Sequence, residues 1–176
     1  GGLQQLHIRV DDVDAAARRL QEAGATFEHR EGRLVVDRAW SALRVAMAAE
    51  PLEPEGGVTA GAVLDHVALV VTDFDAMARR WAVLLGIEPD HVGVHPLGTS
   101  RAARFILGDR MIEVLSPLEG RAPALHERLR RAGDGPFALA LIGPDAEATR
   151  VAVAAAGARV LHHPPHWVVH PVDAAG

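Results

Sequence analysis

The hydrophobic and polar positions along the chain repeat one arrangement three times. Each repeat has five mostly apolar residues of strand type followed by an amphipathic helical segment, and the repeats begin at Leu6, Val67 and Leu139. In the second repeat the apolar stripe of the helical segment consists of Phe74, Met77, Trp81, Leu84 and Leu85. This spacing is that of one helix face directed toward a core. The pattern therefore predicts three strand–helix units.

The same two residue types bound each predicted helix. The starts carry Asp12, Asp73 and Asp145. A carboxylate at this position accepts hydrogen bonds from the unpaired amides of the first turn. The ends carry Gly24, Gly86 and Gly157. Glycine is the residue that most readily enters the left-handed region after a helix, so the three helices are predicted to have nearly equal lengths.

After each helix the alternation changes to period two, which indicates strands. In the second repeat HVGVHP, RAARFILG and RMIEVLSP form three predicted strands, and the turn LGD joins the last two as a hairpin. The first repeat follows the same plan with ATFEHR, RLVVDR and ALRVAMAAE, whereas the third supplies only ARVLHHP and HWVVHPV. Each complete repeat is thus a βαβββ module, and the predicted fold class is α+β.

The modules predict the division of the chain. The first module covers residues 1–50, a linker rich in proline, glycine and acid covers 51–61, and paired modules occupy 62–118 and 135–176. A short helix is expected around residues 122–131, and the third module lacks its fourth strand. Both ends look cut from a longer protein. Because three modules cannot all pair within one chain, we expect either a further module upstream or a homodimer.

Composition narrows the classes of function. The net charge of −5 argues against a nucleic-acid partner. The chain has no cysteine, which excludes disulfides, thiolate zinc sites and cysteine nucleophiles. It has no lysine for a Schiff base or a P-loop. We find no signal peptide and no apolar run of about 18 residues, so a cytoplasmic protein without a membrane partner is expected.

The segments LDHVALVVTDFDAMARRWAVLLGI and RFILGDRMIEVLSP, in this order, resemble the vicinal oxygen chelate superfamily. This superfamily includes glyoxalase I, the extradiol dioxygenases, methylmalonyl-CoA epimerase and the bleomycin-resistance proteins. The resemblance extends over essentially the whole chain as three βαβββ modules, and it implies curled, cup-like mixed sheets of the glyoxalase-like fold. The second and third modules look most like methylmalonyl-CoA epimerase, including the turn HPVDAAG.

The resemblance also implies a divalent metal ion in the cup, held by residues of the first and last strand of each module. The matching positions of the second module are His66 and Glu113. Strand alternation independently places His66 on the same face as Ala68 and Val70. Imidazole and carboxylate ligands suit iron, nickel, manganese, cobalt or zinc. The alternative is a hydrogen-bonded histidine at a strand end and a glutamate that faces solvent.

The other modules depart from this ligand pattern. The first-strand positions that correspond to His66 are Gln5 and Ala138, and alanine cannot bind a metal. The last-strand position of the first module falls near Ala46 or Met47, and the last strand of the third module is missing. His66 and Glu113 are therefore predicted to form half of a metal site.

Three further residues are candidates for substrate binding. His91 and His95 lie four residues apart on a predicted strand and so share a face. Arg104 on the following strand, like Arg101, can hold a carboxylate or phosphate through its guanidinium, although a solvated surface arginine is the alternative. A cluster of histidines in the third module could bind metal or contact substrate at the rim of the cup. These histidines are His162, His163, His166 and His170.

Two functions fit these features. The first is a metal-dependent lyase, isomerase or epimerase that acts on a small oxygenated substrate. Its ion would stabilise an enolate-like charge while an unidentified side chain moves a proton. The second is a metal-free protein that binds or sequesters a small molecule, of the bleomycin-resistance type. The alanine at position 138 favours the second function.

Overall fold

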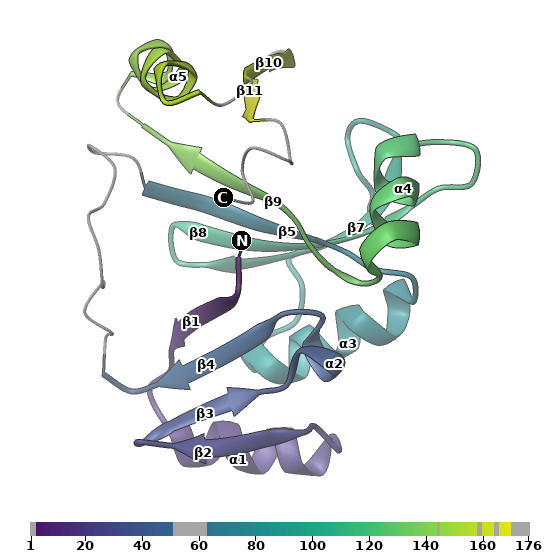
Figure 1. The fold of residues 1–176 in the computed structure, drawn as a ribbon. Helices are drawn as coiled ribbons and strands as arrows, with labels where there is room; N and C mark the ends of the chain where they lie inside the picture. Colours follow the sequence, from purple (N-terminus) through teal and green to yellow (C-terminus); the bar gives the residue numbers. More distant parts are fainter. Residues whose placement is uncertain (1–2, 51–62, 144, 158–159, 164–165, 170–176) are drawn as a thin grey trace. The chain divides into compact units, whose positions relative to one another are not determined.

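The computed structural model describes residues 3–50, 63–143, 145–157, 160–163 and 166–169 (Figure 1). The protein has the predicted α+β class, with one four-stranded sheet, one five-stranded sheet and a two-stranded hairpin in this described part. No helix there is long and apolar enough to cross a membrane. The predicted linker at 51–61 lies outside the described residues.

The first module forms the four-stranded sheet, in the order β1-β4-β3-β2. Its first and last strands run parallel, and the other neighbours are antiparallel, which confirms the predicted βαβββ arrangement. The elements are β1 (Gln5–Arg9), α1 (Val13–Glu22), β2 (Phe27–Arg30), β3 (Arg33–Val36), α2 (Arg38–Ser41) and β4 (Arg44–Ala48).

The second module forms most of the five-stranded sheet, in the order β6-β7-β8-β5-β9. Its elements are β5 (Val63–Val70), α3 (Phe74–Leu85), β6 (His91–Val94), β7 (Ser100–Leu107) and β8 (Arg110–Pro117). The predicted connecting helix is α4 (Pro123–Ala132), and β9 (Gly135–Ile142) adds the first strand of the third module beside β5. The third module continues with α5 (Ala146–Ala155) and the antiparallel pair β10 (Val160–His163) and β11 (His166–Val169).

The predicted helix caps are confirmed. Each of the three aspartates accepts a hydrogen bond from the backbone amide three residues later, at 2.8 to 3.0 Å. Each of the three glycines has a positive φ, between 69° and 90°, which glycine adopts without steric cost. Local sequence therefore determines where α1, α3 and α5 begin and end.

Helix α2 was not predicted. It is a single turn between β3 and β4, where the hydrophobic pattern predicts only a connection. Asp37 caps it by accepting a hydrogen bond from the amide of Ala39 at 2.7 Å, and Trp40 and Ser41 within it are buried. Four residues are too few to show a helical period, and the burial of Trp40 is visible only in the tertiary structure, so strand and helix periods do not predict this turn.

The chain divides into two compact units. The larger unit lies within Gln5–Glu53 and Leu64–Ala140 and contains the first and second modules. The smaller unit lies within Gly1–Gln4, Pro54–Val63 and Leu141–Gly176. The sequence-based division into residues 1–50 and 62–176 stays a prediction.

Polar contacts between side chains and backbone carbonyls join the first and second modules of the larger unit. The indole Nε1 of Trp81, on α3, donates to the carbonyl oxygen of Ser41 at 3.1 Å, and the Trp81 side chain is 0% exposed. The guanidinium of Arg19, on α1, donates to the last carbonyls of α3, those of Val83 at 2.6 Å and Leu84 at 3.2 Å. A cation at a helix C-terminus also complements the negative end of the helix dipole. The predicted core position of Trp81 is thus confirmed.

We expect Arg19→Gln to lower the free energy of unfolding by about 1.5 kcal/mol, because two charged hydrogen bonds to partly buried carbonyls are lost. Urea unfolding measures the change. Arg18→Gln is the matched control, since Arg18 is the exposed neighbour on the same helix, and its cost is expected to stay below about 0.5 kcal/mol. Equal costs for the two variants would show that Arg19 does not join α1 to α3.

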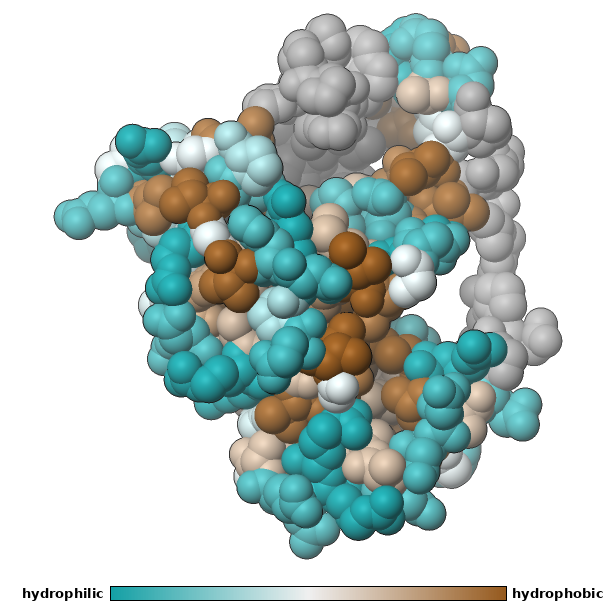
Figure 2. Space-filling model, turned by 180° about the vertical axis from the view of Figure 1, so that it is seen from behind, coloured by the Kyte–Doolittle hydropathy of each residue, from teal (hydrophilic) through white to brown (hydrophobic). Residues whose placement is uncertain are grey.

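Strand β9 stands at one end of the five-stranded order and leaves large hydrophobic side chains exposed. They are Phe137, Leu139, Leu141 and Ile142. Figure 2 shows hydrophobic residues at the surface among hydrophilic ones. An edge strand with apolar side chains is a place where a further strand or chain can pair. The predicted homodimer or upstream module stays a prediction.

Candidate functional site

Strand register places the predicted site residues on one face of the five-stranded sheet. Glu113 on β8 stands opposite Arg104 on β7 and opposite Ala68 on β5, and His91 on β6 stands opposite Arg104. Directly opposed residues point to the same side of a sheet. We call this side the Glu113 face. His66 lies on it too, because His66 precedes Ala68 by two residues on β5.

The opposite face packs against α3. Arg101 on β7 belongs to it, since Arg101 and Arg104 are three residues apart on one strand. The Arg101 guanidinium donates to both carboxylate oxygens of Asp75 on α3, at 2.8 and 3.2 Å, and lies 4.1 Å from the ring centroid of Phe74. The hydrogen bond from Arg101 lowers the pKa of Asp75 below its usual value. Arg101 therefore serves the contact with α3 rather than a ligand.

Glu113 is the centre of a polar cluster. Its side chain is only 5% exposed, and its Oε1 accepts a hydrogen bond from Nε of Arg104 at 2.8 Å. Nε2 of His95 lies 3.7 Å from the same oxygen, too far for a hydrogen bond. The side chains of Arg104 and His95 are 28% and 20% exposed. Burial of a carboxylate costs several kcal/mol unless a cation compensates it, and Arg104 is that cation.

His66 faces the same side but contacts a different carboxylate. Its Nδ1 lies 2.7 Å from Oδ2 of Asp65, and its side chain is 26% exposed. A carboxylate at Nδ1 favours the tautomer with the proton on Nδ1, so that Nε2 carries a lone pair. The structure therefore presents Nε2 of His66 as an acceptor or as a ligand nitrogen.

The two histidines of the β6 region have different surroundings. His95 follows the end of β6, and its Nδ1 accepts a hydrogen bond from the amide of Leu97 at 3.2 Å. His91 lies over Gly93, where an added methyl group would come within 3.0 Å of the imidazole Nε2. His95 thus joins the cluster around Glu113, whereas His91 is exposed at the edge of the same face.

The described side chains do not fit a divalent metal ion on this face. Among the residues that the structure describes, no three His, Asp or Glu side chains come together in a group that could hold one. The buried carboxylate of Glu113 is already bound by the guanidinium of Arg104, which a cation would have to displace. In the first module Ala46 stands opposite His7. Ala46 corresponds by register to Glu113, and its side chain has no atom that can bind a metal ion. We therefore derive no chemical step through a metal.

The histidine cluster of the third module is described only in its backbone. His163 stands opposite His166, and His162 stands opposite Trp167, in the β10–β11 pair. The side chains of these residues, and the whole of His170, lie outside the described part of the chain.

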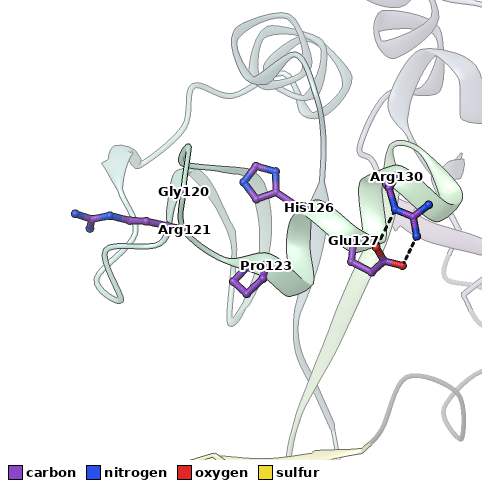
Figure 3. A pocket seen from close by; sticks show the side chains of 6 residues that line it. All are labelled: Gly120, Arg121, Pro123, His126, Glu127 and Arg130. Carbon is purple, nitrogen blue, oxygen red and sulfur yellow. Dashed lines mark hydrogen bonds and ion pairs between the residues drawn. The ribbon is translucent and has the colours of Figure 1, made fainter.

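Two surface depressions in the described part of the chain lie away from the predicted site residues. One lies at the start of α4 and is lined by Gly120, Arg121, Pro123, His126, Glu127 and Arg130. Figure 3 shows that Arg130 and Glu127 on its wall form a two-bonded ion pair, at 2.7 and 2.9 Å. The imidazole of His126 contacts the carbonyl of Leu118. The polar side chains of Glu127, Arg130 and His126 already bond to neighbouring residues, so this depression offers no cluster of unpaired groups.

The pairing of Arg104 with Glu113 was missed from the sequence, where Arg104 was assigned to a substrate anion. The signal was nevertheless present. The β7–β8 hairpin closes at Leu107 and Arg110, and counting outward from this turn pairs Arg104 with Glu113. The register of a two-residue hairpin is set by its turn, so this pair could have been found.

Solved structures share this fold. A mutant of 4-hydroxymandelate synthase from Streptomyces coelicolor matches at a TM-score of 0.71 and 19% identity, over 93% of this chain and 55% of that one. The chain thus spans about half the length of that enzyme. A variant of methylmalonyl-CoA epimerase from the same organism, in complex with 2-nitronate-propionyl-CoA, matches at 0.53 and 24% identity, over 64% of this chain and 90% of that one. The epimerase from Mycobacterium tuberculosis matches at a TM-score of 0.52 and 24% identity, over 64% of this chain and 81% of that one.

These matches show that the chain has the glyoxalase-like fold. At sequence identities below 25%, they show the fold and not the function. The family model for a glyoxalase-like domain matches residues 64–175, which is more than half of the chain. The chain belongs to this family. The resemblance to the vicinal oxygen chelate superfamily is thereby confirmed. No curated protein sequence matches the chain.

Proposed function

We propose that the Glu113 face binds a small oxygenated molecule and that this binding needs no metal ion. The observation that supports it is the ion pair between Glu113 and Arg104, which occupies the carboxylate that a metal would need. The partly exposed side chains of Arg104 and His95 lie beside the buried Glu113 carboxylate, and the partly exposed His66 lies on the same face. They can offer hydrogen bonds to a ligand that approaches the face.

The chemistry of the cluster indicates the kind of ligand. Arg104 uses Nε for Glu113, and among the described residues its two terminal nitrogens have no hydrogen-bond partner. These nitrogens form a fork that matches a carboxylate or a pair of neighbouring oxygens. Because Glu113 already balances the charge of Arg104, a ligand with no more than one negative charge is favoured. The Nε2 lone pair of His66 can accept a hydroxyl proton.

A second function has one observation in its favour. His66 and Glu113 lie on the same face of neighbouring parallel strands, the placement that the superfamily resemblance implies for two metal ligands. A metal-dependent lyase, isomerase or epimerase would require Arg104 to leave Glu113 and further ligands to come from outside the described side chains. The epimerase and synthase relatives make this function worth testing beside the first.

4-Hydroxymandelate is a suitable probe, because it carries one carboxylate beside a hydroxyl group and gives one structural relative its name. We expect it to bind the protein in the absence of metal, and we expect Arg104→Gln to weaken binding at least about tenfold through loss of a charged hydrogen bond. Calorimetric titration measures both affinities. Arg101→Gln on the same strand is the matched control and should leave the affinity unchanged, because Arg101 faces α3.

Metal content distinguishes the two functions. The protein is loaded with cobalt, nickel, manganese or zinc, passed through a desalting column and analysed for bound metal. If binding needs no metal ion, we expect the wild-type protein to retain only traces of metal after the desalting column. One tightly held ion per chain that is lost in His66→Ala would refute the metal-free function and support the metal-dependent one. Absence of any response to the probe with or without metal would refute the proposed class of ligand.

A further inference from the structure

Two arginines from different elements of the larger unit meet at Gly135, the first residue of β9. A methyl group added at Gly135 would lie 2.9 Å from Nη2 of Arg128, on α4, and 3.1 Å from Nη2 of Arg38, on α2. The carbonyl oxygen of Ala42 would lie 3.3 Å away. Both terminal nitrogens thus lie close to one another against the backbone of Gly135, where a side chain at position 135 would crowd them.

The hydrogen bonds of the two arginines leave these nitrogens available. Arg128 donates through Nε to the carbonyl of Pro136 at 3.2 Å and through Nη1 to that of Gly133 at 2.8 Å. These two bonds hold the guanidinium in place and leave Nη2 without a hydrogen-bond partner among the described residues. Arg38 has no hydrogen bond or ion pair with any residue that the structure describes.

The charges of the residues around Arg38 and Arg128 do not cancel. Burial lowers the pKa of Arg128, and the nearby cations Arg38 and Arg131 lower it further, while Asp134 opposes them. The carboxylate of Asp134 is itself engaged, since its Oδ1 accepts hydrogen bonds from the amide and the hydroxyl of Thr72 at 2.9 and 2.7 Å. Three cations therefore face one anion in a protein whose net charge is −5.

We infer that the guanidinium groups of Arg38 and Arg128, which meet at Gly135, form a binding site for a phosphate group. An oxyanion placed between the two Nη2 atoms accepts a hydrogen bond from each. Hydrogen bonds between charged groups are stronger than those between neutral groups. A hydrogen phosphate or a phosphate monoester can also carry a proton that bonds to the carbonyl of Ala42. The site shares no residue with the Glu113 face, so it is independent of the ligand proposed there.

Thermal unfolding in phosphate against chloride at equal ionic strength tests the site. With 20 mM inorganic phosphate we expect the melting temperature of the wild type to rise by about 4 °C, as for a ligand of roughly millimolar affinity. Arg38→Gln should abolish most of this rise. Arg38 is exposed, so this variant should fold. Arg44→Gln, an exposed arginine on β4, is the matched control and should keep the full rise.

Glycerol 3-phosphate in place of inorganic phosphate distinguishes the free ion from an organic phosphate. A larger rise with the ester would identify a phosphorylated small molecule as the occupant, and equal rises would identify the free ion. Phosphorus NMR line broadening on titration provides a second measurement that needs no unfolding, and Arg128→Gln should remove it. Equal melting temperatures in phosphate and chloride, or a rise retained in Arg38→Gln, would overturn the inference.

Discussion

Trp81→Ala is expected to lower the free energy of unfolding by about 4 kcal/mol, the largest effect of any single change considered for this protein. Trp81 is fully buried on α3 and donates its indole hydrogen to the carbonyl of Ser41 in the first module. The substitution removes a large apolar side chain and leaves a cavity at the contact between two modules. Urea unfolding followed by circular dichroism measures the loss.

Trp81→Phe separates packing from hydrogen bonding at this position. It keeps most of the apolar volume but removes the indole donor, so we expect a cost of about 1.5 kcal/mol from the unpaired Ser41 carbonyl and the smaller ring. A loss of less than about 1 kcal/mol for Trp81→Ala would mean that the modules do not depend on this contact. A loss that is as large for phenylalanine as for alanine would assign the effect to the hydrogen bond.

Arg104→Met is expected to cost about 3 kcal/mol, because it leaves the Glu113 carboxylate buried without its cation. Glu113 is only 5% exposed, whereas Arg104 is 28% exposed. Glu113→Gln should therefore cost less, about 1 kcal/mol, since the remaining guanidinium can turn toward water. Equilibrium unfolding of the two single variants measures this asymmetry.

The single variant Glu113→Leu and the double variant Arg104→Met with Glu113→Leu complete a double-mutant cycle. Replacing both charges by apolar groups removes the uncompensated charge, so we expect the double variant to be more stable than Arg104→Met alone by about 2 kcal/mol. Strict additivity of the two single changes would show that the side chains do not interact. That result would also remove the observation on which the metal-free function rests.

The Glu113 face and the arginine pair at Gly135 differ in the source of the anion that balances their cations. On the Glu113 face the anion is part of the protein, so the cluster is nearly neutral and favours a ligand bound through shared hydrogen bonds. At Gly135 the described residues supply cations in excess, and the balancing anion has to come from outside. Titrations with 4-hydroxymandelate and with phosphate can therefore fail or succeed separately.

Much of the fold could be predicted from the sequence because it depends on local rules. The three aspartate caps and three glycine stops set the ends of α1, α3 and α5, and they act within one or two turns of the chain. Strand alternation likewise assigns Glu113 and His66 to one face without any knowledge of tertiary contacts. Helix α2 escaped prediction because its single turn is too short to show a helical period.

The candidate site was predicted in position but not in chemistry. Strand alternation in the sequence puts His66 and Glu113 on one face, and the register of the structure agrees. That these residues form a functional site stays a prediction. Strand alternation does not say which side chains pair. That Arg104 binds Glu113 follows from hairpin register, and that His66 contacts Asp65 depends on rotamers, which no sequence period reports.

By itself, the amino-acid sequence determined the repeated βαβββ order, the helix ends and the face on which each strand residue lies, since these depend on neighbours along the chain. Only the tertiary structure decided that Arg19 and Trp81 join the first two modules, that Arg104 neutralises Glu113, and that Arg38 meets Arg128 at Gly135. Each of these contacts connects residues of different elements. Their charges and shapes become complementary or opposed only after the elements have packed together.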